Sequence, residues 1–121
     1  MAGFVDATKV AHDAFDPAAF VAQLDPDWTV FERPHGGYLA AVLARAAGMA
    51  LAGAGHTDPL AASIHFLASP LSGPASVLVD VLRAGRTVSQ VRASLVQDGR
   101  RCVEALLTMG RLDSASTAYW T

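Results

Sequence analysis

Apolar side chains recur at three- and four-residue spacing between Tyr38 and Leu51, a pattern that predicts one α-helix. Gly53 and Gly55 follow this stretch and supply a stop signal. Arg45 is the one charged residue within it, so other parts of the chain must cover most of the helix. The pattern therefore predicts a central helix, whose apolar stripe is Leu39, Val42, Leu43, Ala46 and Ala50.

After this helix the apolar period changes to two, which is typical of half-buried strands. Four segments alternate in this way: "ASIHFLASP", "SVLVDVLR", "TVSQVRASLVQ" and "RCVEALLTM". The signals "PLSGP", "RAGR" and "QDGR" separate them, and Asp98-Gly99 favours a tight hairpin with positive φ at both residues. We predict an antiparallel meander of four strands. The residues on the apolar faces of the four segments are, in order, Ile64, Phe66 and Ala68; Val77, Val79 and Val81; Val91, Ala93 and Leu95; and Val103, Ala105, Leu107 and Met109. In the fourth segment, the opposite face carries Cys102, Glu104, Leu106 and Thr108.

Residues 1–27 leave two alternatives open. In "DPAAFVAQL", Asp16 is suited to cap a helix with Pro17 at its first position. The same segment also suits a strand at 19–24 that ends at the turn "DPDW".

We expect one domain over residues 1–121, of the α+β class, in which a curved antiparallel sheet wraps the central helix. Hydrophobic residues make up 52% of the chain and charged residues 17%, which is ample for one core. An open sheet has free edges, and an edge strand is a template for a second copy. A homodimer or higher homo-oligomer is therefore expected.

Charge and cysteine content narrow the possible partners. A net charge of −2 gives no electrostatic reason to expect nucleic acid or an anionic membrane surface. Cys102 is the only cysteine, which excludes an internal disulfide and suits a reducing compartment. The first residues lack a secretory signal pattern, so the cytoplasm is the expected location.

The helix is preceded by an unusual cluster, His35-Gly36-Gly37-Tyr38. Backbone N–H groups at a helix start, approached closely across glycine, are suited to hold a developing oxyanion. The alternative is that the glycines only let the helix enter beneath a curved sheet without steric conflict. His35 is a weaker candidate for acid–base chemistry, because no carboxylate is near it in the sequence.

Other polar residues have less specific patterns. His65 lies in mid-strand and suits a hydrogen-bonded role as well as a catalytic one, and His56 is expected in a solvated loop. Asp58, expected in a turn, and Glu104 are the remaining candidates for a general base. Arginines gather around the two hairpins, where they suit either phosphate binding or protection of a sheet edge: Arg83, Arg86, Arg92, Arg100 and Arg101.

Three segments, "WTVFERPHGGYLAAVLARAA", "ASIHFLASPLSGP" and "VLRAGRTVSQVRASLVQDGR", resemble the amino-terminal half of TesB-like acyl-CoA thioesterases, a hot-dog family. The resemblance runs from about Trp28 to Leu112 and implies a strand at 19–24. It implies hydrolysis of an acyl thioester to a free acid and coenzyme A, with no metal or other cofactor. It also implies oxyanion donors at the Gly37 and Tyr38 amides.

The same resemblance raises a second hypothesis. Such proteins normally carry two hot-dog repeats, and their catalytic aspartate, serine or threonine, and glutamine lie in the second one, which is absent here. The glutamine's counterpart in this chain is Thr108, so no catalytic residue carries over. A non-catalytic module that binds acyl-CoA, or a structural half of a larger assembly, is the alternative. In either case we expect substrate contacts at Gly36, His65, Arg86 and Thr87.

Overall fold

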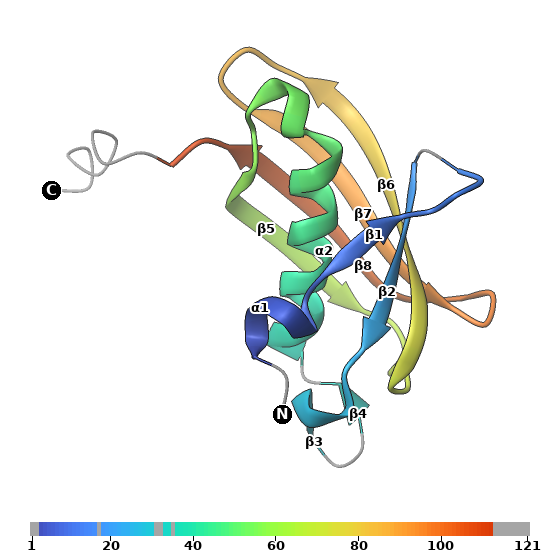
Figure 1. Cartoon of the computed structure of the whole chain (residues 1–121). Helices are drawn as coiled ribbons and strands as arrows, with labels where there is room; N and C mark the ends of the chain where they lie inside the picture. The colour runs from blue at the N-terminus through green and yellow to red at the C-terminus, as the bar shows by residue number, and fades with distance from the viewer. Residues whose placement is uncertain (1–2, 17, 31–32, 35, 113–121) are drawn as a thin grey trace, which may run out of the picture.

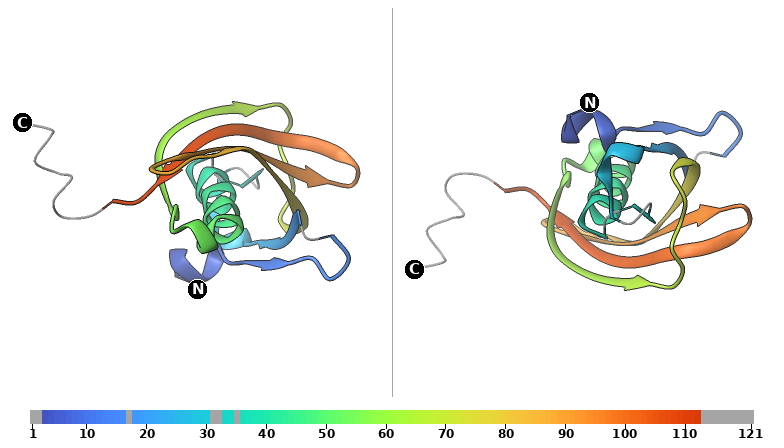
Figure 2. Two further views of the ribbon diagram at one scale, coloured as in Figure 1. Left: turned by 90° about the horizontal axis from the view of Figure 1, so that it is seen from above. Right: turned by 90° about the horizontal axis from the view of Figure 1, so that it is seen from below.

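A six-stranded antiparallel sheet curves around one long helix in the computed structural model, which describes residues 3–16, 18–30, 33–34 and 36–112 (Figures 1 and 2). This confirms the predicted fold class. The strands follow the order β1 (Val10–His12), β2 (Ala19–Leu24), β6 (Gly73–Ala84), β7 (Ser89–Gln97), β8 (Arg100–Gly110) and β5 (Asp58–Phe66). The other elements are α1 (Phe4–Ala7), η1 (Pro26–Trp28), β3 (Thr29–Val30), β4 (Arg33–Pro34), α2 (Gly36–Ala50) and η2 (Ala52–Ala54).

The predicted central helix is α2, which begins two residues before the predicted start and ends one residue before the predicted end. Most of the predicted stripe is buried, but Ala50 is exposed because it is the last residue of the helix. Among the described residues, no helix combines the length and apolar character needed to cross a bilayer. The buried residues of α2 are Tyr38, Leu39, Val42, Leu43, Ala46, Ala47 and Gly48.

The segment at 19–24 is a strand, so the helical alternative was wrong. β2 pairs with β6 along its whole length, from Ala19 opposite Leu78 to Leu24 opposite Gly73. Asp16 begins a turn instead of a helix, because its carboxylate accepts a hydrogen bond from the Ala18 amide at 2.9 Å. Pro17 lies outside the described residues.

The predicted four-strand meander is wrong in its first link. β6, β7 and β8 are successive neighbours, but β5 pairs with β8 instead of β6, and β2 takes the place beside β6. The six residues at 67–72 between β5 and β6 are longer than a tight hairpin and allow this crossover. Burial agrees with this order: Val77 and Val79 of β6 are buried, whereas every position of β5 is exposed or half-exposed, as is typical of an edge strand.

The hairpin between β7 and β8 turns as predicted. Asp98 has φ 52° and Gly99 has φ 74°, so both central residues are in the left-handed region. The start of β8 differs from the prediction, which placed Cys102 and Val103 on opposite faces of the strand: both residues are buried. The register shifts at Leu95 and Val96, so Cys102 lies at a β-bulge that interrupts the strict alternation.

Candidate functional site

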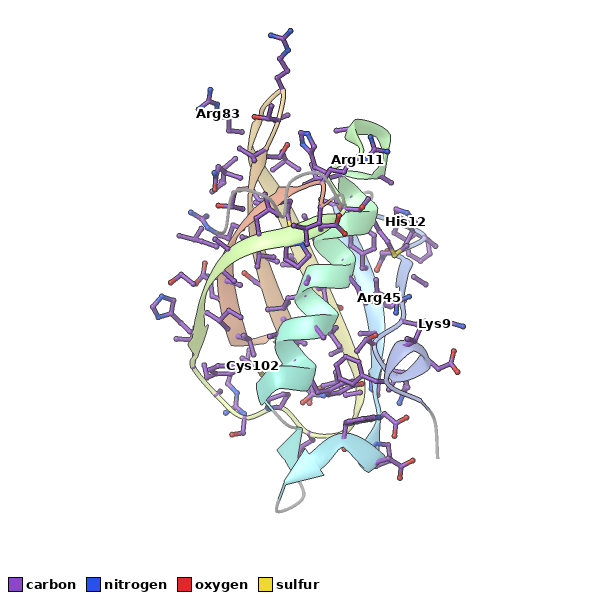
Figure 3. All side chains as sticks on the ribbon, turned by 90° about the vertical axis from the view of Figure 1, so that its left-hand side faces the viewer. Lys9, His12, Arg45, Arg83, Cys102 and Arg111 are labelled. Carbon is purple, nitrogen blue, oxygen red and sulfur yellow. The ribbon has the colours of Figure 1, made fainter. Side chains whose placement is uncertain are left out.

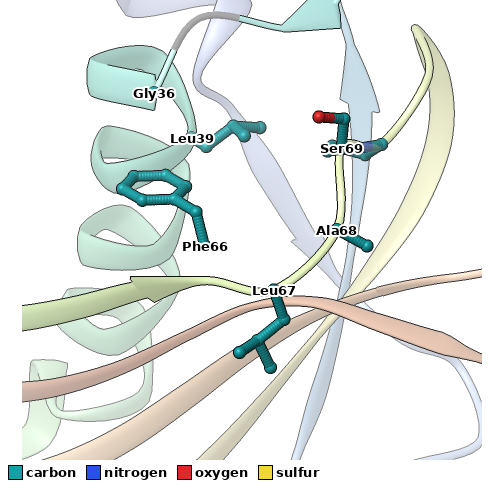
Figure 4. A pocket seen from close by; sticks show the side chains of 7 residues that line it. Gly36, Leu39, Phe66, Leu67, Ala68 and Ser69 are labelled. Carbon is teal, nitrogen blue, oxygen red and sulfur yellow. The ribbon is translucent and has the colours of Figure 1, made fainter.

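A pocket of about 340 Å³ lies at the N-terminal end of α2 (Figure 4). Gly36 and Leu39 form one side, and the residues that follow β5 form the other; the Phe66 ring lies against α2, and Ser69 lies across the pocket from the helix. A Cβ on Gly36 would lie 3.4 Å from the Phe66 ring, an ordinary contact distance. The lining residues are Gly36, Leu39, Phe66, Leu67, Ala68, Ser69 and Pro70.

The first turn of α2 contains the two predicted oxyanion donors, Gly37 and Tyr38. N–H groups in a first turn point out of the helix, at the positive end of its dipole. Gly37 is exposed and its neighbour Gly36 lines the pocket. Tyr38 is buried, and neither Gly37 nor Tyr38 is itself a lining residue of the pocket. His35, the predicted acid–base candidate, lies outside the described residues.

The Tyr38 side chain has a structural role that the sequence pattern did not indicate. Its buried hydroxyl donates a hydrogen bond to the Ala7 carbonyl at 2.7 Å and accepts one from the Asp25 amide at 2.9 Å. Burial raises the pKa of this phenol, and the nearby Asp25 carboxylate acts in the same direction, against the hydrogen bond from the Asp25 amide. The ring also packs with Phe4 and Trp28. These contacts anchor the first turn of α2.

A second anchor, Gln97, holds the other side of the pocket. Its side-chain oxygen accepts a hydrogen bond from the Leu71 amide at 2.8 Å. Its side-chain amide donates to the carbonyls of Leu71, at 2.8 Å, and Pro74, at 3.2 Å. Gln97 is thus a link from the end of β7 to the connection between β5 and β6. Nothing in the local sequence signals this contact, because its partners lie more than 20 residues away.

The candidate bases and His65 do not line this pocket. His65 is exposed on the sheet face turned away from α2, in register with Glu104. The Glu104 carboxylate lies 3.6 Å from both Arg92 and Arg101, in surface ion pairs. Thr108, on the same outer face, donates to the Gln90 side chain at 2.9 Å.

Asp58 lies at the start of β5 instead of in a turn, and its carboxylate accepts the Leu112 amide at 2.7 Å. His56, expected in a solvated loop, is instead buried, with 5% of its surface exposed. Its Nδ1 lies 2.8 Å from the Ser89 hydroxyl, so the prediction missed a partner 33 residues away.

Arg86 and Thr87, two of the predicted substrate contacts, do not line the pocket beside Gly36. They line a different pocket, near the C-terminal end of α2. In the part of the chain that the structure describes, no three His, Cys, Asp or Glu side chains are grouped closely enough to hold a metal ion.

Comparison with known proteins identifies the fold and the family. Residues 24–110 match the model of the acyl-CoA thioesterase N-terminal domain. An uncharacterized protein of Mycobacterium tuberculosis is 34% identical over 103 residues, which are 81% of this chain and 35% of that protein. The chain therefore spans about a third of the length of the curated relatives that it matches.

Solved structures give the same result. A Thermobifida fusca protein provisionally named thioesterase II is 35% identical, with a TM-score of 0.82 over 93% of this chain and 41% of that one. A hot-dog protein from Alicyclobacillus acidocaldarius has 26% identity and a TM-score of 0.74 over 94% of this chain and 42% of that one.

A lower-identity structure shares the fold. It is a hypothetical thioesterase from Streptococcus pneumoniae, solved with coenzyme A, with 20% identity and a TM-score of 0.68 over 78% of this chain and 80% of that one. The architecture is thus the hot-dog fold, and the family match covers the helix, its N-terminal turn and the sheet from Leu24 to Gly110. The chain belongs to the acyl-CoA thioesterase N-terminal domain family.

Proposed function

We propose that this domain hydrolyses acyl-CoA thioesters, with the carbonyl bound at the N-terminal end of α2. The observation that carries the proposal is the pocket beside Gly36, which gives a ligand access to the first turn of the helix. Leu39 and Phe66 offer apolar surface for an acyl group there. The segment "RAGRTVSQVRASLVQDGR" favours the TesB-like branch of the family.

In the proposed reaction, water adds to the thioester carbonyl and the charge on oxygen is stabilised by the amides of Gly37 and Tyr38. The carbon–sulfur bond then breaks, leaving a carboxylic acid, and the coenzyme A thiolate takes up a proton. The helix dipole favours the negative charge that develops on the oxygen. Tyr38 contributes through its amide, because its hydroxyl is occupied by Ala7 and Asp25.

One observation supports the second candidate, a domain that binds acyl-CoA without hydrolysing it. Within the described residues, the pocket lining includes no carboxylate or imidazole, and Ser69 is its one polar side chain. A water molecule in this pocket would lack a general base from this stretch of the chain. Hydrolysis would then need a group from elsewhere.

A second copy of the chain is one source of such a group, and we propose that the domain is at least a homodimer. β5 is an edge strand, and its residues are exposed or half-exposed along its whole length. Pairing with another β5 would cover this edge and satisfy its outward backbone groups.

The two candidate functions are separated by incubating the protein with a panel of acyl-CoAs and a thiol reagent. Hydrolysis predicts release of free thiol that Gly37→Val lowers by roughly 100-fold or more, because the new side chain obstructs the amide groups. Gly3→Val is the matched control, since a Cβ there meets no atom within 4 Å. Saturable binding without thiol release would favour the binding domain, and unchanged turnover in a folded Gly37→Val variant would exclude the proposed oxyanion site.

A further inference from the structure

A second pocket, of about 330 Å³, lies at the opposite end of α2 from the proposed thioester site. The 15 residues of α2 separate the two pockets by about 22 Å at 1.5 Å per residue. Figure 3 shows Arg111 at this end of the helix. Three separate segments line the pocket: the end of η2 with the two residues after it, the β6–β7 hairpin, and the residue that follows β8. The lining residues are Ala54, Gly55, His56, Arg86, Thr87 and Arg111.

Within the described part of the chain, no ion pair neutralises the positive charge on this pocket. Among the described residues, neither Arg86 nor Arg111 pairs with a carboxylate, whereas Arg92 and Arg101 both pair with Glu104. Asp58, two residues after His56, is engaged by the Leu112 amide. Two exposed guanidinium groups therefore border one cavity, and each offers the forked set of donors that matches phosphate oxygens.

A buried histidine fixes the main chain of this pocket. The His56 ring lies between the Ser89 hydroxyl, 2.8 Å from Nδ1, and the Arg86 carbonyl, 3.3 Å from Nε2. In a neutral ring protonated at Nε2, both nitrogens are satisfied: Nε2 donates to Arg86 and Nδ1 accepts from Ser89. His56 thus holds the backbone of Arg86 against the segment that follows η2.

Two backbone features complete the framework. A Cβ on Gly85 would overlap the Val88 carbonyl oxygen, so the hairpin that presents Arg86 and Thr87 requires glycine. At the end of β8, Met109 pairs with Ser89 of β7. This backbone pairing brings Arg111, two residues after Met109, next to the hairpin that carries Arg86 and Thr87.

We infer that this pocket binds a phosphate group, held by the guanidinium groups of Arg86 and Arg111 with the Thr87 hydroxyl as a further donor. The ligand is either the nucleotide part of a coenzyme A thioester, in which case the inference rests on the proposed function, or a free phosphate ion. Arginines near a helix C-terminus are also favoured by the helix dipole, so binding itself must be measured.

The experiment is calorimetric titration of the intact protein at constant ionic strength with three probes: coenzyme A, pantetheine and inorganic phosphate. The variants are the double substitution Arg86→Ala with Arg111→Ala, and Arg83→Ala, an exposed arginine on β6 that does not line the pocket. We expect coenzyme A to bind at least about tenfold more weakly to the double variant. Pantetheine, which lacks phosphate, should be unaffected, and Arg83→Ala should behave as the unaltered protein.

The outcomes separate the two sources of phosphate. Competition between inorganic phosphate and coenzyme A would assign the pocket to the nucleotide part, and phosphate binding without an effect on coenzyme A would assign it to a free anion. The inference would be overturned if the folded double variant bound both coenzyme A and phosphate as tightly as the unaltered protein does. Failure of hydrolysis alone would not overturn it, because the readout is binding.

Discussion

At the scale of single residues, Tyr38 links the fold to the proposed chemistry. Its side chain is almost fully buried, with 1% of its surface exposed, and its hydroxyl joins α1, the end of β2 and the first turn of α2. Replacement by phenylalanine keeps the ring but leaves the Ala7 carbonyl and the Asp25 amide without this partner.

Tyr38→Phe is therefore expected to lower the free energy of unfolding by about 1–3 kcal/mol, the usual cost of a buried polar group left unsatisfied. Urea denaturation measures this change directly. Thr108→Val, which removes an exposed hydrogen bond to Gln90, is the control and should change stability much less. Equal effects of the two substitutions would contradict the anchoring role of the phenol.

The raised pKa of Tyr38 gives a separate prediction about pH. The folded protein keeps the phenol neutral at a pH where the unfolded chain ionises, so the free energy of unfolding should fall as the pH rises above about 10. Tyr38→Phe should lack this part of the alkaline loss. Denaturation midpoints compared at pH 8 and above pH 10 test the difference; parallel loss in both proteins would refute it.

The residues that sequence reasoning placed correctly are those whose role depends on their immediate neighbours. Gly36 and Gly37 at the helix start and Asp98-Gly99 in the hairpin belong to this kind. His56 was expected in a solvated loop and the contacts of Gln97 were not predicted, because the hydrogen-bond partners of both residues lie more than 20 residues away.

At the scale of elements, the connection between β5 and β6 decides the shape of the pocket. Its residues from Leu67 to Pro70 line the wall opposite α2, and Gln97 holds Leu71 next to them. Alternating apolar residues predicted the strands on both sides but not their order, since periodicity reports which face is buried and not which strands pair. In the structure β2 pairs with β6, and β5 pairs with β8 at the edge of the sheet.

Gln97→Ala should release this connection without unfolding the sheet. We expect faster amide hydrogen exchange at Leu71, whose N–H loses its acceptor, and a raised KM for any thioester that uses the pocket. Gln90→Ala, at a β7 residue that faces Thr108, is the matched control and should leave exchange at Leu71 unchanged. Unaltered protection of Leu71 in Gln97→Ala would show that the connection is held by other contacts.

At the scale of the whole molecule, the domain presents two pockets at the two ends of α2 and an edge strand, β5, that runs between them. The fold class followed from one apolar helix and a series of alternating strands. The proposed homodimer would use an edge strand that the single chain leaves uncovered.

The exposed edge strand β5 leads to a prediction about the molar mass of the protein in solution. If β5 pairs with a second copy, light scattering should give about twice the 12.6 kDa of one chain. Ala62→Lys, in the middle of β5, should weaken the association by placing like charges on the paired edges. A mass of one chain at all concentrations tested would contradict pairing through β5.

Amide NMR can observe directly whether a thioester carbonyl binds at the first turn of α2. The probe is an acyl-CoA analogue in which a methylene replaces the thioester sulfur, so that it keeps the carbonyl and resists hydrolysis. We expect saturable shifts of the Gly37 and Tyr38 amide resonances, reduced when the same ligand lacks the carbonyl oxygen. Saturation of binding with both resonances unmoved would contradict it.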